Sequence, residues 1–292
     1  MVIWKLGKLY LLLATVGVHL FWYGFMLMAI DPHQGVLTRI SCVTIPFADV
    51  GVLGFWLVAG SCRAWLRMMA SIVGLSSILA IMVNVIPIYP FVLATALAST
   101  MSITAIGTLL LGGIAGYLPG WQGWRVKFAL WEIIAATCLV GVALAVLRTV
   151  LVDLTISWEQ WMGDAEGEFL IYSIVSGLSV AISGLPILSS VRSTRVLSVL
   201  VMCVLLAAMP FVEGLLFVGV LEVELGAERV LLVFALHLLQ MGFAWGTLIP
   251  LKMTFPGFVA SLETRATDEQ AETPNNGVTQ VDRPADDFLK MQ

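Results

Sequence analysis

The sequence predicts an all-α, polytopic integral membrane protein with about eight transmembrane helices, on three observations. Hydrophobic residues make up 60% of the 292 residues and charged residues only 12%, whereas a soluble domain has roughly 45–50% and about 25%. Eight stretches are apolar over about 20 residues, the length that a helix needs to cross the bilayer core. A helix is favoured there because it satisfies its own backbone hydrogen bonds. Lys and Arg gather in alternate loops, as they do on the cytoplasmic side of membrane proteins. A soluble globule is therefore excluded.

The predicted spans are long apolar runs that cover residues 7–30, 44–61, 67–86, 91–117, 128–151, 169–189, 196–219 and 230–253. The first follows Lys5 and Lys8, and its apolar run is too long for a secretory signal, so we expect an uncleaved helix. The second contains Pro46, Asp49 and three glycines, which disfavour an ordinary lipid-facing helix. If this second segment is re-entrant, the count falls to seven.

Prolines and charged residues mark the ends and the kinks of the remaining spans. The turn 84–90 contains two prolines, which disfavour helix in the residues before them and so join the third and fourth spans in a tight hairpin. Arg125 and Lys127 precede the fifth span, and an acidic loop separates it from the sixth. Pro186 and Pro210 are expected to kink the sixth and seventh spans. The eighth span ends in a cationic segment.

Charge placement predicts the orientation. The loops on one face hold nine cations and no carboxylate: Lys5, Lys8, Arg63, Arg67, Arg125, Lys127, Arg192, Arg195 and Lys252. The other face holds nine carboxylates and three arginines: Asp31, Asp153, Glu159, Asp164, Glu166, Glu168, Glu222, Glu224, Glu228, Arg39, Arg148 and Arg229. The cationic face is expected to be cytoplasmic, which places both termini in the cytoplasm. The expected membrane is a bacterial-type plasma (inner) membrane.

The chain divides into a membrane domain, 1–255, and a tail, 256–292. The domain has 12 Lys/Arg and 12 Asp/Glu, whereas the tail has 3 and 7, so the whole net charge of -4 belongs to the tail. Because the tail has few large apolar residues, we expect a disordered cytoplasmic segment. The expected partners are the bilayer and other membrane proteins or a second copy, and no feature points to nucleic acid.

Familiar catalytic and metal-binding signatures are missing from the sequence. The four cysteines stand apart and form neither a metal motif nor a disulfide framework: Cys42, Cys62, Cys138 and Cys203. There is no Walker loop, dinucleotide-binding glycine fingerprint, nucleophile elbow or His-Glu-x-x-His. An enzyme of a familiar soluble type is therefore not expected.

Ionisable residues inside the spans are the remaining candidates for function, because each costs about 2.5–3.5 kcal/mol on insertion scales. Five such residues occur: His19, Asp49, Glu132, Glu213 and His237. Glu132 lies near Lys127, and Asp49 lies near the outer end of its span. For these two we expect ion pairing, with Arg39 as the partner of Asp49, or anchoring at the interface.

Glu213 and His237 are almost equally far from the loop that joins the seventh and eighth spans, which centres near residues 224–225. They should therefore lie at matching depth, roughly 10–15 Å below the outer surface. If their faces meet, they can form a proton or ion site in the outer half of the bundle, with Asp49 or Gln240 as further members. The alternative is a structural hydrogen bond that holds the hairpin together.

His19 and His237 offer a second constellation. The segments that begin at these residues share the pattern His-Leu-x-x-x-Gly-Phe on the first and last spans. Two imidazoles on facing helices could clamp the iron of haem b or bind copper. A lone membrane histidine more often just forms a hydrogen bond.

Three functions follow from these candidates. The favoured one is a small-solute or ion transporter or translocation subunit, with coupling to protons through Glu213 and His237. The second is a membrane redox or metal-handling protein that uses His19 and His237 as ligands. The third is a structural or assembly subunit whose polar residues only pack.

Overall fold

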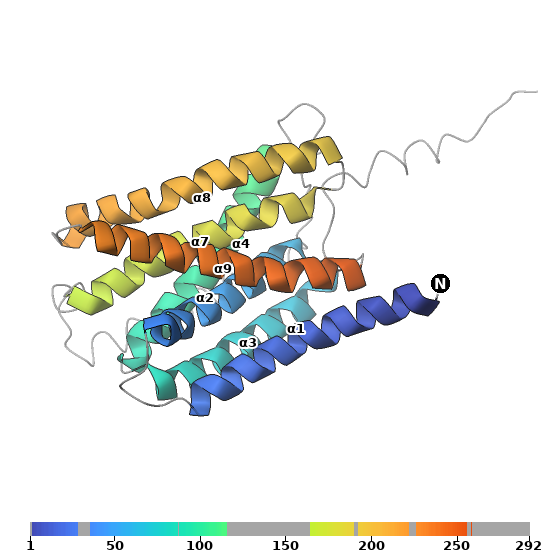
Figure 1. Ribbon diagram of the computed structural model, residues 1–292, viewed down its shortest axis with the longest axis horizontal. Helices are drawn as coiled ribbons and strands as arrows, with labels where there is room; N and C mark the ends of the chain where they lie inside the picture. The colour runs from blue at the N-terminus through green and yellow to red at the C-terminus, as the bar shows by residue number, and fades with distance from the viewer. Residues whose placement is uncertain are drawn as a thin grey trace, which may run out of the picture.

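A computed structural model describes residues 2–28, 36–86, 88–115, 164–189, 192–221, 226–255 and 258. In these ranges the chain forms seven α-helices, each long and apolar enough to cross a membrane, and no strand. The helices are α1 Val2–Met28, α2 Val36–Ala59, α3 Ala64–Val85, α4 Pro90–Ala115, α7 Asp164–Leu188, α8 Arg192–Leu221 and α9 Ala227–Thr254 (Figure 1). The predicted helical membrane bundle is thus confirmed. The predicted fifth span, 128–151, with Glu132, and the tail 256–292, apart from residue 258, lie outside the described residues.

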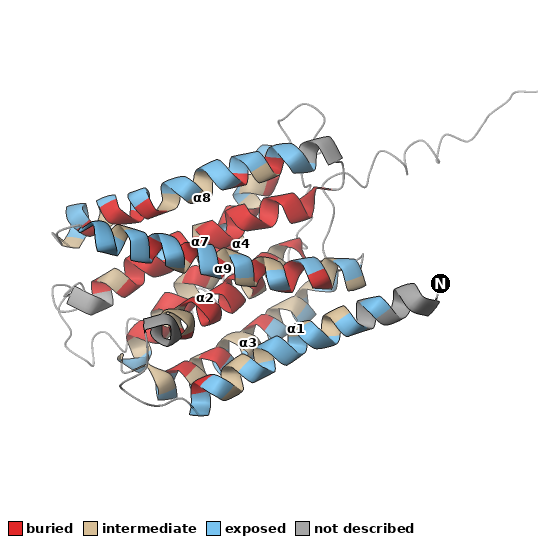
Figure 2. Ribbon diagram, viewed as in Figure 1, coloured by how far each residue is buried: buried red, intermediate tan, exposed pale blue. Residues whose placement is uncertain are grey.

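Helices α2 and α7 form the centre of the bundle, and most of their residues are buried (Figure 2). Helix α4 lies against both of them, α8 packs on α7, and α9 contacts α2, α7, α8 and α1. Helix α1 is at the edge and is mostly exposed (Figure 2). Helix α9 therefore lies between α1 and α8 and contacts both of them.

Helix α2 is one continuous helix of 24 residues with Pro46 inside it, so the re-entrant alternative is wrong. Its glycines permit close packing at the centre. A Cβ on Gly54 would lie 2.3 Å from the carbonyl oxygen of Met101 on α4, and one on Gly51 would lie 2.8 Å from Val180 on α7. The glycines of this segment therefore serve contact with protein in place of lipid.

Helices α4 and α7 run parallel. Thr100 donates a hydrogen bond to the carbonyl of Ser173 at 3.0 Å, and Thr104 donates to the carbonyl of Gly177 at 2.9 Å. Because both residue numbers rise by four between these bonds, the two helices point the same way. Helix α4 therefore ends on the face opposite to the one where α7 begins, as an alternation of eight spans requires.

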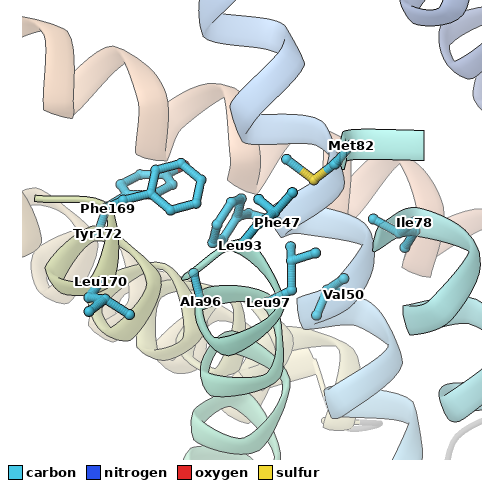
Figure 3. Packing of buried hydrophobic residues seen from close by; sticks show 10 residues of the cluster. All are labelled: Phe47, Val50, Ile78, Met82, Leu93, Ala96, Leu97, Phe169, Leu170 and Tyr172. Atoms are coloured by element: carbon cyan, nitrogen blue, oxygen red, sulfur yellow. The ribbon is translucent and has the colours of Figure 1, made fainter. Parts of the chain in front are cut away.

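A buried apolar cluster joins the outer ends of the central helices (Figure 3). The ring of Phe47 on α2 meets Phe169 and Tyr172 on α7 edge-on, each at a centroid distance of 5.2 Å. Leu93 and Leu97 of α4, both fully buried, complete the contact. The cluster fixes Tyr172 beside the polar residues of α9.

Cations cap helix ends on the face that the sequence predicts to be cytoplasmic. The Arg67 guanidinium donates to the carbonyls of Val58 and Gly60 at the end of α2, at 3.0 and 2.6 Å. Lys252 of α9 and Arg195 of α8 donate to carbonyls at the end of α7. Cations at helix C-termini satisfy free carbonyls and oppose the helix dipole.

Candidate functional site

Glu213 on α8 and His237 on α9 form a buried pair, here called the α8–α9 pair. His237 Nε2 lies 2.5 Å from Glu213 Oε2, and the side chains are 3% and 1% exposed. Glu213 lies eight residues before the end of its span at Leu221, and His237 ten residues after Ala227. At 1.5 Å per residue both are about 12–15 Å from the helix ends. The structure therefore brings together Glu213 and His237, which the sequence predicts to lie at equal depth in the membrane.

Polar side chains of α7 line the other side of His237. Ser179 Oγ lies 3.4 Å from His237 Nδ1, and Gln240 donates from Nε2 to Ser176 Oγ. The two serines are three residues apart, as are His237 and Gln240, so each pair shares a helix face. The ring of Tyr172 stacks on the imidazole at a centroid distance of 5.5 Å. Gln240 thus belongs to this site, as the sequence predicted.

Two acceptors in this site are buried and have no hydrogen-bond donor among the residues that the structure describes: Glu213 Oε1 and Gln240 Oε1. Leaving such an atom unsatisfied in a protein interior costs about 1–3 kcal/mol. An ionised carboxylate has about four acceptor positions, and His237 uses one of those on Glu213. The site can therefore accept a proton at a carboxylate oxygen that makes no structural bond.

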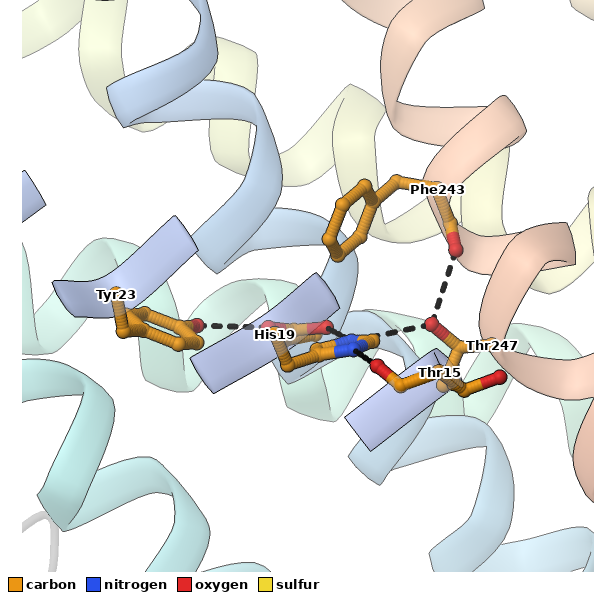
Figure 4. A network of polar contacts seen from close by, with 6 residues as sticks. Thr15, His19, Tyr23, Phe243 and Thr247 are labelled. Carbon is orange, nitrogen blue, oxygen red and sulfur yellow. Dashed lines mark hydrogen bonds and ion pairs between the residues drawn. The ribbon is translucent and has the colours of Figure 1, made fainter. Parts of the chain in front are cut away.

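His19 on α1 and Asp49 on α2 form a second pair, here called the α1–α2 pair (Figure 4). His19 Nε2 lies 3.0 Å from Asp49 Oδ1, and the Tyr23 hydroxyl donates to Asp49 Oδ2 at 2.7 Å. Asp49 is only 8% exposed. Asp49 is thus held by two side chains of α1, and the side chain of its expected partner Arg39 lies outside the described residues.

His19 contacts three groups through its two ring nitrogens. Its Nδ1 lies 2.7 Å from the carbonyl of Thr15, and a carbonyl only accepts, so Nδ1 is the donor. Its Nε2 lies 3.0 Å from Asp49 Oδ1 and 3.2 Å from the hydroxyl of Thr247 on α9, which donates to the carbonyl of Phe243 at 3.0 Å. His19 thus links α1 to both α2 and α9.

The structure does not present His19 and His237 as a pair of ligands for one metal. Their Nε2 atoms point to different carboxylates, Asp49 on α2 and Glu213 on α8. In the described part of the chain no group of three or more His, Cys, Asp or Glu side chains could hold a metal ion. The arrangement of these side chains gives no support to ligation of haem b or copper.

The predicted span bounds concealed the α1–α2 pair. His19 lies nine residues before the end of its span at Met28, and Asp49 lies nine residues after Ile40. The predicted spans 7–30 and 44–61 had placed the two residues eleven and five residues from the facing ends, so the equal-depth argument did not select them. The supporting residues Tyr23, Ser176 and Ser179 carry no such signal, because hydroxyl groups are common in packed membrane helices.

Comparisons of the chain with models of protein families, with curated proteins and with solved structures found no match. One buried and one partly buried histidine–carboxylate pair on seven described membrane helices are thus the observations from which function is argued.

Proposed function

We propose that this multi-pass membrane protein is a proton-coupled transporter of small solutes, and that the α8–α9 pair is its proton-binding site. One observation carries the proposal: a carboxylate and an imidazole meet at 2.5 Å while fully buried in membrane-spanning helices. Ionisable groups at such depth are costly and usually mark ion or proton pathways. Histidine is also the side chain whose ordinary titration falls near neutral pH.

The surroundings of the pair favour proton binding over a purely structural bond. A structural hydrogen bond is best when every polar atom in it is satisfied. Here Glu213 Oε1 has no donor, and His237 Nδ1 has only the 3.4 Å contact with Ser179. These atoms leave the pair able to change its proton number without breaking another bond.

A change in proton number also alters what holds two helices together. When His237 Nδ1 carries a hydrogen and one proton is shared between Nε2 and Oε2, the pair is neutral overall, whether that proton resides on His237 or on Glu213. A second proton on Glu213 leaves a positive charge and removes the negative partner of the imidazolium. The balance between conformations that keep or separate the α8–α9 contact then depends on protonation, which is the coupling that a proton-driven transporter needs.

The test compares Glu213→Gln with Glu168→Gln in liposomes that contain the purified protein and an entrapped pH-sensitive dye. Glu168 is a matched control because its ion pair with Arg229, at 3.3 Å, is exposed. Small neutral, anionic and cationic solutes are added one at a time, and proton movement is recorded. We expect proton movement with at least one solute in the wild type and in Glu168→Gln, and none in Glu213→Gln.

A second measurement does not need the solute. Infrared difference spectra between about pH 5 and pH 8, the range in which histidine titrates, report the carbonyl stretch of a protonated carboxylic acid. We expect a band that Glu213→Gln removes and Glu168→Gln keeps. Identical difference spectra for the wild type and Glu213→Gln overturn the proposal and leave the structural role as the better interpretation. Proton movement that persists in Glu213→Gln overturns it as well.

A further inference from the structure

A groove of about 710 Å³ runs between α1 and α9. Its walls are apolar side chains and two glycines, including Leu11, Val18, Leu238, Gly242 and Gly246. Among the described residues that line it, Thr15, His19 and Thr247 are the only polar ones. Figure 4 shows these three side chains together between the two helices. The groove is thus apolar except where Thr15, His19 and Thr247 meet, here called the polar spot.

The polar spot is costly if only hydrocarbon lies against it. His19 and Asp49 are hydrogen-bonded to each other at 3.0 Å, yet the His19 side chain is 22% exposed and the Asp49 side chain 11%. His19 lies nine residues from the outer end of its span, which is about 13 Å along the helix. Lipid chains offer no hydrogen bond at that depth. A molecule that carries a polar group to this level is therefore favoured over an acyl chain.

The shape of the groove fits a small molecule better than a helix. A Cβ on Gly242 or Gly246 would meet no atom within 4 Å, although glycines four residues apart usually mark a close helix contact. A spanning helix 30 Å long and 10 Å wide occupies about 2,400 Å³, more than three times the groove. Small-molecule sites in proteins have volumes of about 300–1,000 Å³.

We propose that the α1–α9 groove binds an uncharged lipophile with a single hydroxyl group, and that this hydroxyl lies against His19 and Thr247. Thr247 Oγ1 gives its hydrogen to the carbonyl of Phe243 and keeps an acceptor position, and His19 Nε2 lies 3.2 Å from the same oxygen. A ligand hydroxyl can donate to this position, whereas a carbonyl or an ether oxygen only accepts. Thr247 therefore favours a hydroxyl.

The site is independent of the proposed proton site. None of the residues that line the groove belongs to the α8–α9 pair. Binding to the groove can therefore be measured in variants that leave Glu213 and His237 intact, and its failure does not affect the proposed function.

The test uses labelled nonylphenol and labelled nonylbenzene, which differ only in the hydroxyl group. Their equilibrium binding is measured with the full chain in phosphatidylcholine nanodiscs, and empty nanodiscs give the background partition. We expect saturable binding of one nonylphenol per protein, with an affinity about tenfold higher than that of nonylbenzene, the equivalent of about 1.4 kcal/mol.

Three variants locate the binding. Gly246→Leu fills the groove, whereas the matched control Gly219→Leu adds the same side chain on α8, where a Cβ also meets no atom within 4 Å. We expect Gly246→Leu to abolish saturable binding and Gly219→Leu to preserve it. Thr247→Val removes one acceptor and should lower the nonylphenol affinity about tenfold while leaving the nonylbenzene affinity unchanged.

Several outcomes overturn the proposal. If nonylphenol binds no better to protein-containing nanodiscs than to empty ones, lipid chains fill the groove. Equal affinities of the two probes show that the polar spot does not contact the ligand. If saturable binding is absent and Gly246→Leu converts a dimer into a monomer by size-exclusion chromatography, the groove is a helix–helix interface between copies of the chain.

Discussion

Replacement of His237, which pairs with Glu213 in the interior, should destabilise the protein far more than replacement of Arg229, which pairs with Glu168 at the surface. In His237→Leu the Glu213 carboxyl group, 1% exposed, loses its one hydrogen-bond partner among the described residues. Breaking a buried pair in this way costs about 3 kcal/mol, which is a change of roughly 150-fold in the unfolding equilibrium. In the matched variant Arg229→Leu the pair with Glu168 is exposed, and we expect a loss below about 1 kcal/mol.

The assay is equilibrium unfolding in mixed micelles, followed by circular dichroism. The double variant Glu213→Met/His237→Leu replaces both polar groups with apolar ones, so it should recover most of the stability lost in His237→Leu. Together with the single variant Glu213→Met, it gives the coupling energy of the two residues, which we expect to be about 2 kcal/mol. If His237→Leu costs no more than Arg229→Leu, or if the losses of the two single variants simply add in the double variant, the reasoning is refuted.

Three further predictions test the packing, the orientation and the helix ends. Gly54→Ala should destabilise the bundle by about 2 kcal/mol in the same unfolding assay, because its Cβ would lie 2.3 Å from the carbonyl of Met101; Gly113→Ala, whose Cβ meets no atom within 4 Å, should be neutral or slightly stabilising. A membrane-impermeant maleimide should label the exposed Cys62 only after permeabilisation of cells, and labelling of intact cells would reverse the predicted orientation. Arg67→Met should cost about 1–2 kcal/mol by freeing two carbonyls at the end of α2; unchanged stability would show that water replaces the guanidinium.

Depth along a helix could be predicted from the sequence, but the choice of partner at a given depth could not. His19, Asp49, Glu213 and His237 all lie eight to ten residues from the facing ends of their spans. The sequence alone therefore allowed either histidine to face either carboxylate, or the other histidine. Which side chains meet depends on the rotation of each helix about its axis, and this is set by packing between helices that are distant in sequence.

Hydropathy identified the spans but did not indicate which helix is central. Helix α2 contains Pro46, Asp49 and several glycines, and these residues suggested that it does not cross the membrane. In the structure the same residues face α1, α4 and α7. A hydropathy scale measures the preference of a segment for lipid, so it underrates a helix that protein surrounds.

The contact between α4 and α7 combines small residues with threonines. On α7, Ser173, Gly177 and Ala181 are spaced four residues apart and lie against α4. On α4 the contact includes Thr104, which bonds to the carbonyl of Gly177. Threonine is larger than glycine or alanine, so it gives a weaker sequence signal for close approach, although its hydroxyl can bond to the backbone.

The threonine hydroxyls between α4 and α7 have a consequence for how the bundle can open. Thr100 and Thr104 each have one hydrogen and two acceptors in reach: a carbonyl of α7 and the carbonyl four residues earlier in α4 itself, at 3.0 and 2.8 Å respectively. If the two helices part, each hydroxyl keeps the bond to its own helix, and no donor is left unsatisfied in the membrane. The α4–α7 contact can therefore separate at little electrostatic cost. Separation of the α8–α9 contact, in contrast, requires the movement of a proton or the exposure of a charge.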